Sequence, residues 1–308
     1  TQTLRDLVRQ RANHVRLCAQ HVQRMQKALQ LMNLKLTHVL GDITGVTGLK
    51  IIRSIINGER DPVELAKLRD RRCKHDEAEI AEALTGRYRS EHVLELELCY
   101  TMWQHYQAVI TKLDGAIDAH LKTMQRHDLP PLPKKARVRG RKPHDPKFDV
   151  RTALYFLLGL DLTAIEGIDE IHALTLISEL GTDFSKWPTV QHFTSWLGLC
   201  PNWKQTGGKV KSSRTRKGKG RAAHALCLAA WGLMRSKSYL GAYLRRMRAR
   251  LGAPKAITAT AHKLARIIYA LVRYGVAYQK KSEEDFAEQH RQRMEKNLHK
   301  RAKEMGYE

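Results

Sequence analysis

The chain has 308 residues, of which 42% are hydrophobic and 6% aromatic, so it is long enough for two domains or for one domain with a long helical appendage. Its 55 Lys and Arg residues outnumber 31 Asp and Glu residues, which gives a formal net charge of +24. A positive field of this size favours a polyanionic partner, nucleic acid first and an acidic membrane surface second, over an inert basic protein.

The first 40 residues carry apolar side chains three and four positions apart, which predicts the seam of a coiled coil. An ordinary amphipathic helix in a bundle is the alternative. A second helical stretch runs from about Glu91 to Met124, so the two helices predict either an antiparallel arm or a dimerising coiled coil. The seam residues are Val15, Cys18, Val22, Met25, Leu29, Met32, Leu36 and Val39.

Two later stretches, residues 43–61 and 165–183, both read I-x-G-[VI] followed by a helical pattern, a Gly and a terminal Asp. Each copy resembles a helix-hairpin-helix element, in which a glycine turn lets backbone N–H groups approach a phosphate. In the second copy Gly167 and Ile168 are the candidate phosphate-binding residues. A tight helix–helix corner with a glycine cap is the alternative.

Residues 128–149 hold five of the nine prolines and seven basic residues, which is typical of a linker. Helical patterns follow at 150–158, 169–180, 189–197, 221–235, 237–250 and 256–274. The expected fold class is therefore mainly α, with a coiled-coil or helical arm followed by an all-helical domain that carries the helix-hairpin-helix-like elements. The predicted divisions are an arm (1–127), a basic linker (128–149), a C-terminal domain (150–280) and a charged helical tail, solvated or frayed (281–308).

The stretch "KQTGGKVKSSRTRKGKGR" (204–221) concentrates eight Lys and Arg residues around a Thr-Gly-Gly turn, with a hairpin expected around 203–215. A Walker loop is excluded because Trp203 and Val210 occupy positions that require Gly and Ser or Thr. We expect Trp203 to pack in the core, with stacking on a base as the alternative. The candidate phosphate-binding residues are Gly207, Gly208, Lys209, Lys211, Arg214, Arg216, Lys217, Lys219 and Arg221.

The sequence shows no sign of other common sites. The histidines have no paired metal-ligand spacing, and the acidic residues fall on solvated helix faces. The five cysteines are scattered and form no C-x-x-C pair, so neither a disulfide framework nor a zinc knuckle is indicated, and a reducing cytosol fits. The longest apolar run, residues 226–234, is too short to span a bilayer, so no membrane partner is expected.

Residues 165–230, "IEGIDEIHALTLISELGTDFSKW…AAHALCLAA", resemble the C-terminal transposase domain of DEDD insertion-sequence transposases. That family includes Piv-type DNA invertases and bridge-RNA-guided recombinases. Residues 239–275 resemble the helices that close the same domain, and residues 25–70 resemble the coiled-coil region of the family.

The resemblance implies an oligomeric DNA recombinase with an active site in two parts. One is a RuvC-like N-terminal domain whose four carboxylates bind Mg²⁺, and the other is a serine in an S-G-G turn that attacks a DNA phosphate. Here Thr206 stands at the serine position and Gly220 at the usual asparagine. The chain begins where the RuvC-like domain should be ending, so Mg²⁺ is expected for the full-length family enzyme and not for this chain alone.

The predicted function is that of a transposase or site-specific recombinase for insertion-sequence mobility, which attacks a DNA phosphate through the hydroxyl of Thr206. This chain is expected to bind DNA and not to cut it. Ser212 and Ser213 are the alternative nucleophiles. The expected partners are DNA, a guide (bridge) RNA and further copies of the chain, in the bacterial cytoplasm at the nucleoid. The alternative function is a non-enzymatic nucleic-acid-binding protein derived from such a transposase; a basic coiled-coil protein at membranes is disfavoured.

Overall fold

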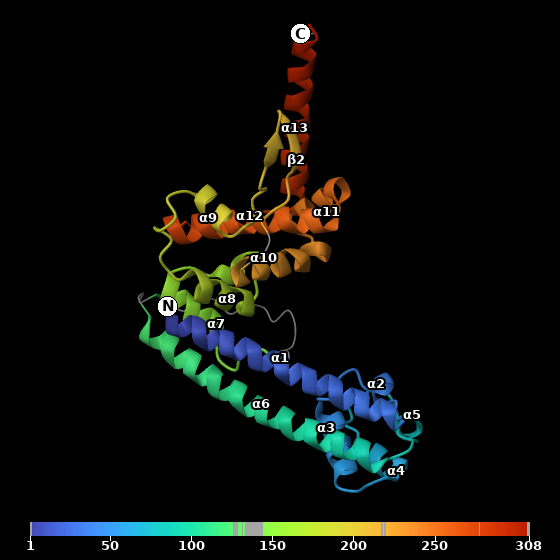
Figure 1. Cartoon of the computed structure of the whole chain (residues 1–308). Helices are drawn as coiled ribbons and strands as arrows, with labels where there is room; N and C mark the ends of the chain where they lie inside the picture. The colour runs from blue at the N-terminus through green and yellow to red at the C-terminus, as the bar shows by residue number, and fades with distance from the viewer. Residues whose placement is uncertain are drawn as a thin grey trace. The chain divides into compact units, whose positions relative to one another are not determined.

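The computed structural model describes residues 2–125, 129–130, 132, 144–216, 218, 220–276 and 278–306. Within these residues the chain forms helices and one two-stranded sheet, which confirms the mainly α fold class (Figure 1). Most of the predicted linker at 128–149 lies outside the described residues. The chain divides into two compact units, residues 9–115 and residues 1–8 together with 116–308.

Two long helices, α1 (Gln2–Leu31) and α6 (Ser90–Thr123), contribute to both units. In the unit 9–115 they form an antiparallel pair (Figure 1): Arg11, early in α1, meets Asp114, late in α6, whereas Cys18 further along α1 meets the earlier Gln107. The seam of α1 is thus covered by α6 of the same chain, which is the predicted antiparallel arm. The insert between them contains α2 (Leu36–Val39), α3 (Val46–Ile56), α4 (Pro62–Ala66) and α5 (Glu77–Ala83).

The prediction of one unbroken seam from Val15 to Val39 is wrong, because α1 ends at Leu31. Asn33 adopts a φ of 60°, the N–H of Leu34 donates to the Leu29 carbonyl at 2.9 Å, and the N–H of Asn33 donates to the Gln30 carbonyl at 2.9 Å. These bonds form a Schellman-type C-terminal cap, which satisfies carbonyls at the helix end and turns the chain away.

Self-association through the coiled coil stays a prediction. The seam residues Cys18, Met25 and Leu29 are already buried within the chain. The large exposed apolar residues of α6 are Leu94, Leu98 and Met102, which are spaced four apart and therefore share one face of the helix.

A buried ion pair joins the two long helices of the unit 9–115. Arg11 Nε lies 2.5 Å from Asp114 Oδ1, and the two residues are 6% and 2% exposed. Charges removed from water are tolerated only where each compensates the other, so this pair fixes which residues of α1 and α6 face each other.

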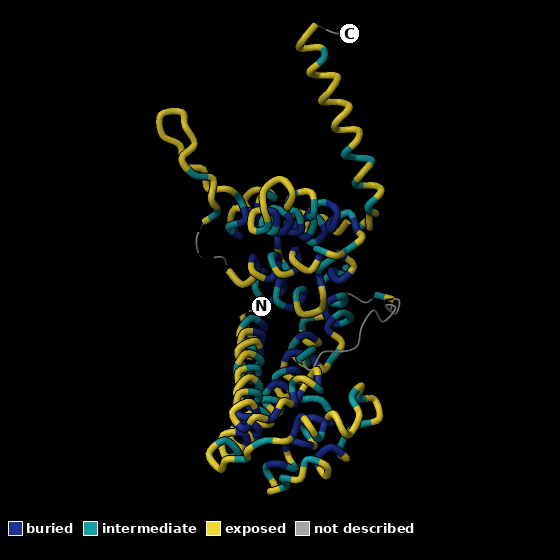
Figure 2. Tube along the Cα trace, turned by 90° about the vertical axis from the view of Figure 1, so that its right-hand side faces the viewer, coloured by how far each residue is buried: buried dark blue, intermediate teal, exposed yellow. Residues whose placement is uncertain are grey.

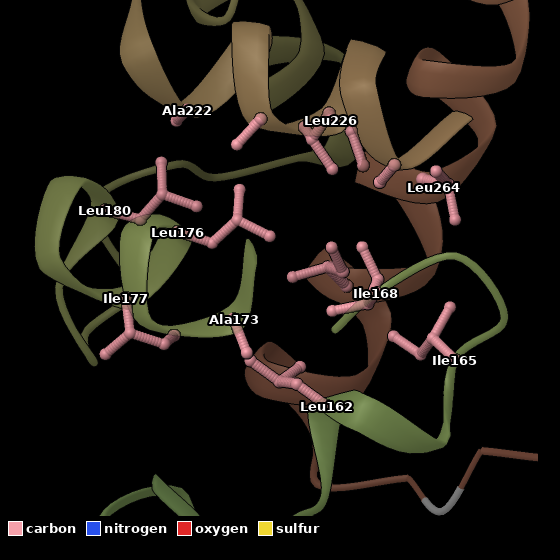
Figure 3. Packing of buried hydrophobic residues seen from close by; sticks show 14 of the residues in the cluster. Leu162, Ile165, Ile168, Ala173, Leu176, Ile177, Leu180, Ala222, Leu226 and Leu264 are labelled. Carbon is pink, nitrogen blue, oxygen red and sulfur yellow. The ribbon is translucent and has the colours of Figure 1, made fainter. Parts of the chain in front are cut away.

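The second unit is built around α10 (Arg221–Gly232), which packs between α8 (Glu170–Leu180) and α12 (Ala253–Tyr274). Figure 3 shows Leu176 and Leu180 of α8 facing Ala222 and Leu226 of α10, with Leu264 of α12 on the opposite side of the same cluster. The buried face of α10 is mostly alanine, which lets the helix backbones approach closely. The other elements are α7 (Val150–Leu158), η1 (Leu162–Ala164), α9 (Val190–Trp196), β1 (Lys204–Thr206), β2 (Lys209–Ser212), η2 (Leu233–Arg235), α11 (Tyr239–Leu251) and α13 (Glu283–Glu304).

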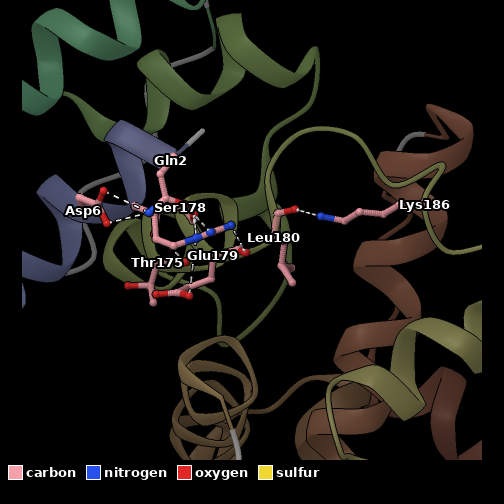
Figure 4. Close-up of polar contacts among 8 residues, drawn as sticks. Gln2, Asp6, Thr175, Ser178, Glu179, Leu180 and Lys186 are labelled. Carbon is pink, nitrogen blue, oxygen red and sulfur yellow. Dashed lines mark hydrogen bonds and ion pairs between the residues drawn. The ribbon is translucent and has the colours of Figure 1, made fainter.

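The C-terminal end of α8 is held by two cationic side chains (Figure 4). Arg5 donates to the carbonyl oxygens of Ser178 and Glu179 at 3.2 and 3.1 Å, and Lys186 Nζ donates to that of Leu180 at 2.6 Å. Burial, and then the nearby charge of Arg5, lowers the pKa of Lys186. These donors satisfy carbonyls that the helix leaves without partners and complement its dipole.

The charged tail predicted at 281–308 contains α13, which has no buried residue. A capping box starts this helix, in which the Ser282 hydroxyl accepts from the Asp285 N–H at 3.1 Å. Its first turns contact α11, where the Phe286 ring lies 5.2 Å from that of Tyr239. The start of the tail is therefore anchored to the C-terminal unit.

Loss of one member of the buried ion pair is predicted to destabilise the unit 9–115. Asp114→Leu leaves the Arg11 guanidinium buried without its carboxylate, at an expected cost of roughly 3–5 kcal/mol in the free energy of unfolding. The double variant Arg11→Met with Asp114→Leu should recover most of that loss, because it buries no uncompensated charge. Urea unfolding followed by circular dichroism measures the free energy of unfolding of the single and the double variant. A double variant as unstable as the single one would contradict the role given to the ion pair.

Candidate nucleic-acid interface

The Thr-Gly-Gly stretch forms the turn of a β-hairpin, as the sequence predicted. Strands β1 and β2 are antiparallel, with Thr206 opposite Lys209 and Gln205 opposite Val210. Gly207 and Gly208 have φ values of 57° and 72°. Two successive positive φ angles are typical of a type I′ turn, whose twist matches that of the strands and for which glycine carries the smallest penalty.

The chain that leads to the hairpin contributes Trp187 and Phe193 to an aromatic cluster in the core. Phe193 of α9 lies 4.8 Å from the Trp187 ring and 5.5 Å from the Tyr269 ring, and Tyr269 Oη donates to the Trp187 carbonyl at 2.8 Å. At the foot of the hairpin the N–H of Asn202 donates to the Arg214 carbonyl at 3.0 Å. This bond closes the foot of the hairpin, where Asn202 and Arg214 are exposed like the residues of the tip.

The cationic side chains that the structure describes in this segment are exposed to solvent. Residues 201–211 are exposed without interruption (Figure 2). Lys217 and Lys219 lie outside the described residues. Within the described part of the chain, no ion pair with an acidic residue involves Lys204, Lys209, Lys211, Arg214, Arg216 or Arg221. Their mutual repulsion is thus uncompensated within the described residues.

The chain returns from the hairpin into the N-terminus of α10. Gly220 is the N-cap residue and provides no side-chain cap, and the first turn contains Arg221 and no acidic residue. A helix N-terminus is the positive end of the helix dipole, so an arginine there is unfavourable unless an anion lies nearby. The basic hairpin and the start of α10 therefore present positive potential from side chains and backbone together.

The second helix-hairpin-helix-like turn has the opposite charge. Gly167 has a φ of 87°, and a Cβ there would lie 2.7 Å from the Ala229 carbonyl oxygen, so the turn is pressed against α10. The N–H of Ile168 donates to the Ile165 carbonyl at 3.1 Å, and Ile168 is buried. Asp169 caps α8 by accepting from the His172 N–H at 2.8 Å. Close packing and the acidic cap favour the corner alternative for Gly167 and Ile168.

The first helix-hairpin-helix-like stretch, residues 43–61, has no acidic cap at the start of its helix, unlike the second. The N-cap of α3 is Gly45, which makes no side-chain cap, and the first turn has no acidic residue. A Cβ on Gly48 would lie 2.2 Å from the Ile43 carbonyl oxygen, so this glycine is required for close packing. Both copies continue into an 11-residue helix, α3 and α8, which is the shared pattern seen in the sequence.

Thr206 ends β1 beside the turn, and its side chain is exposed. Ser212 lies at the end of β2, where its hydroxyl oxygen accepts from the Arg214 N–H at 3.3 Å. Within the described residues no group of three or more His, Cys, Asp or Glu side chains could hold a metal ion. The described residues therefore do not fit a Mg²⁺ site.

Three exposed tryptophans accompany the basic segment in the chain. Trp203 is 65% exposed, so the prediction that it packs in the core is wrong. Trp196 and Trp231 are 59% and 62% exposed. The sequence pattern missed these two because Trp196 ends α9 and Trp231 falls near the end of α10, where apolar residues resemble core positions. Lys204 was also missed as a candidate, although it belongs to the same basic run.

These features define a helical unit that presents a basic hairpin and is suited to a polyanion. Residues 161–245 match the model of the transposase IS116/IS110/IS902 family. The matched stretch includes α8, α9, the hairpin and α10, and the match supports the interpretation that the chain is a member of a transposase family.

Comparison with curated proteins gave no match. No helix among the described residues is long and apolar enough to cross a membrane.

Proposed function

We propose that this chain contributes the DNA-binding part of a transposase that acts in insertion-sequence mobility, with the hairpin at 204–212 and the start of α10 lying against the DNA backbone. The observation that carries the proposal is the row of exposed cations without described acidic partners, on a hairpin inside the stretch that matches the transposase family. A duplex supplies the missing negative charge and releases its condensed counterions on binding.

The contacts proposed here are with phosphates and carry no sequence information of their own. Lysine and arginine side chains on a narrow hairpin reach phosphate oxygens, and these contacts fix the position and orientation of a protein on the duplex. The exposed Trp203 next to β1 adds a ring on which an unpaired base can stack. A guide RNA and the location at the nucleoid stay predictions.

In an enzyme that also has a metal-binding carboxylate domain, the proposed chemical role of Thr206 is nucleophilic attack on a DNA phosphate. Its hydroxyl oxygen would form a phosphothreonine ester while one P–O ester bond of the strand breaks, and the leaving oxygen would take up a proton. The hydroxyl must lose its own proton to a base. Since the described residues supply no carboxylate cluster near the turn, we propose that this chain binds DNA without cleaving it.

Removal of hairpin charge is predicted to weaken DNA binding in a salt-dependent way. Lys209→Gln, Lys211→Gln and Arg214→Gln together should reduce the slope of log K against log[salt] by about 0.9 for each phosphate that the variant no longer neutralises. Fluorescence anisotropy with a labelled duplex over a salt series measures the slope. The matched control is Lys27→Gln, Lys35→Gln and Lys50→Gln, three exposed lysines of the unit 9–115. Equal slopes in the two triple variants would contradict the proposed interface.

The chain with Mg²⁺ and a nicked suicide duplex is predicted to form no covalent protein–DNA adduct above the level of Thr206→Ala. Denaturing gels of the labelled duplex give the measurement, with Ser212→Ala and Ser213→Ala as matched hydroxyl controls. An adduct in the wild-type chain that Thr206→Ala abolishes would establish the nucleophile and refute the non-cleaving role. If Ser212→Ala or Ser213→Ala abolished it instead, the assignment of the turn would be wrong as well.

A further inference from the structure

A second cationic site lies between α11 and α13 in the C-terminal unit. These two helices enclose a pocket with about 310 Å³ of empty space, including its open mouth. The lining residues that matter here are Tyr239, Tyr243 and Arg246 from α11 and Phe286, His290 and Arg293 from α13.

The aromatic wall of this pocket is held in place by packing and hydrogen bonds. The Phe286 ring meets the rings of Tyr239 and Tyr243 edge-on, at 5.2 and 6.3 Å between centroids. Tyr239 Oη donates to Gln289 Oε1 at 3.1 Å and accepts from Lys263 Nζ at 3.2 Å. The wall is thus fixed from α11, α12 and α13 together.

Positive charge surrounds this wall. Lys263 Nζ lies 4.4 and 4.3 Å from the ring centroids of Tyr239 and Tyr243, within cation–π distance. Burial, and then the charges of Arg293, Arg266 and Lys281, lowers the pKa of Lys263 to about 8. The protein therefore holds an ammonium group among like charges, an arrangement that an anion would stabilise.

The nearby carboxylates are paired with other residues. Glu283 binds Arg245 at 2.6 Å, and Glu288 binds Arg291 at 2.6 Å. No Asp or Glu among the described residues lines the pocket. Docking of α13 on α11 accounts for the apolar contact of Phe286, but it gives no reason to face Arg246 and Arg293 toward the same space, because like charges oppose that docking.

We propose that the pocket between α11 and α13 binds a phosphate group of a DNA strand, with Arg246 and Arg293 donating to its oxygens from the two helices. Guanidinium groups suit this ligand because their planar donors match phosphate oxygens in pairs. The ring wall supports the neighbouring sugar and base. The proposal rests on DNA binding by this chain and adds to the hairpin a second contact for the strand.

The experiment follows acetylation of Lys263 at neutral pH by mass spectrometry, with inorganic phosphate or a short single-stranded oligothymidylate as the probe. A bound phosphate should raise the pKa of Lys263 and slow its modification roughly tenfold for each pKa unit. Arg246→Gln with Arg293→Gln should remove the response to both probes. The matched control is Arg250→Gln with Arg301→Gln, which removes two exposed arginines from the same helices and should keep the response.

The two probes and the hairpin variant separate the possible outcomes. With Lys209, Lys211 and Arg214 replaced by Gln, the oligothymidylate should act only at higher concentration, whereas inorganic phosphate should act as in the wild type. A response to inorganic phosphate without any response to the oligothymidylate would contradict a DNA ligand. Unchanged acetylation with both probes in the wild type would overturn the pocket, even if the hairpin variant loses DNA affinity. If the hairpin variant kept full DNA affinity and an intact Lys263 response, the proposed role of the hairpin would be refuted while the pocket proposal would stand.

Discussion

Close packing of the alanine face of α10 is the constraint on which the C-terminal unit depends. Alanine side chains at Ala222, Ala225 and Ala229 let α10 approach its neighbours until a Cβ on Gly167 would meet the Ala229 carbonyl oxygen at 2.7 Å. Larger side chains there would separate the helices, and interiors this dense leave little room to adapt. This packing fixes the start of α10, and with it the point to which the basic hairpin returns.

The N-termini of α8 and α10, two helices that pack against each other, carry opposite charges. The start of α8 carries Asp169 and Glu170 and lies beside the packed Gly167 turn, so it neutralises its own dipole. The start of α10 has Gly220 and Arg221, and the positive charge continues into the hairpin. An acidic side chain at a helix N-terminus stabilises the helix without any ligand. A basic side chain there is unfavourable unless a bound anion offsets its charge. The distribution of charge therefore favours α10 as the phosphate-facing helix of the two.

Local signals in the sequence predicted much of this architecture. The bounds of α7 agree because Asp149 caps its start and Gly159 takes the left-handed conformation at its end. The Thr-Gly-Gly hairpin was predictable because a type I′ turn favours glycine. The end of α1 was not, since Asn33 breaks the helix without interrupting the apolar repeat. The Gly167 corner depends on Ala229, and the pocket between α11 and α13 depends on two helices far apart in the chain, so no local pattern contains either of them.

The central claim is that the hairpin lies against DNA phosphates, and lysine footprinting tests it most directly. Brief acetylation of the chain with and without duplex DNA, read by mass spectrometry, compares Lys204, Lys209 and Lys211 with the exposed lysines Lys27, Lys35 and Lys50 of the unit 9–115. The account predicts that DNA protects the first three and leaves the second three reactive. Equal protection of both sets, or hairpin lysines that stay fully reactive in the complex, would contradict it.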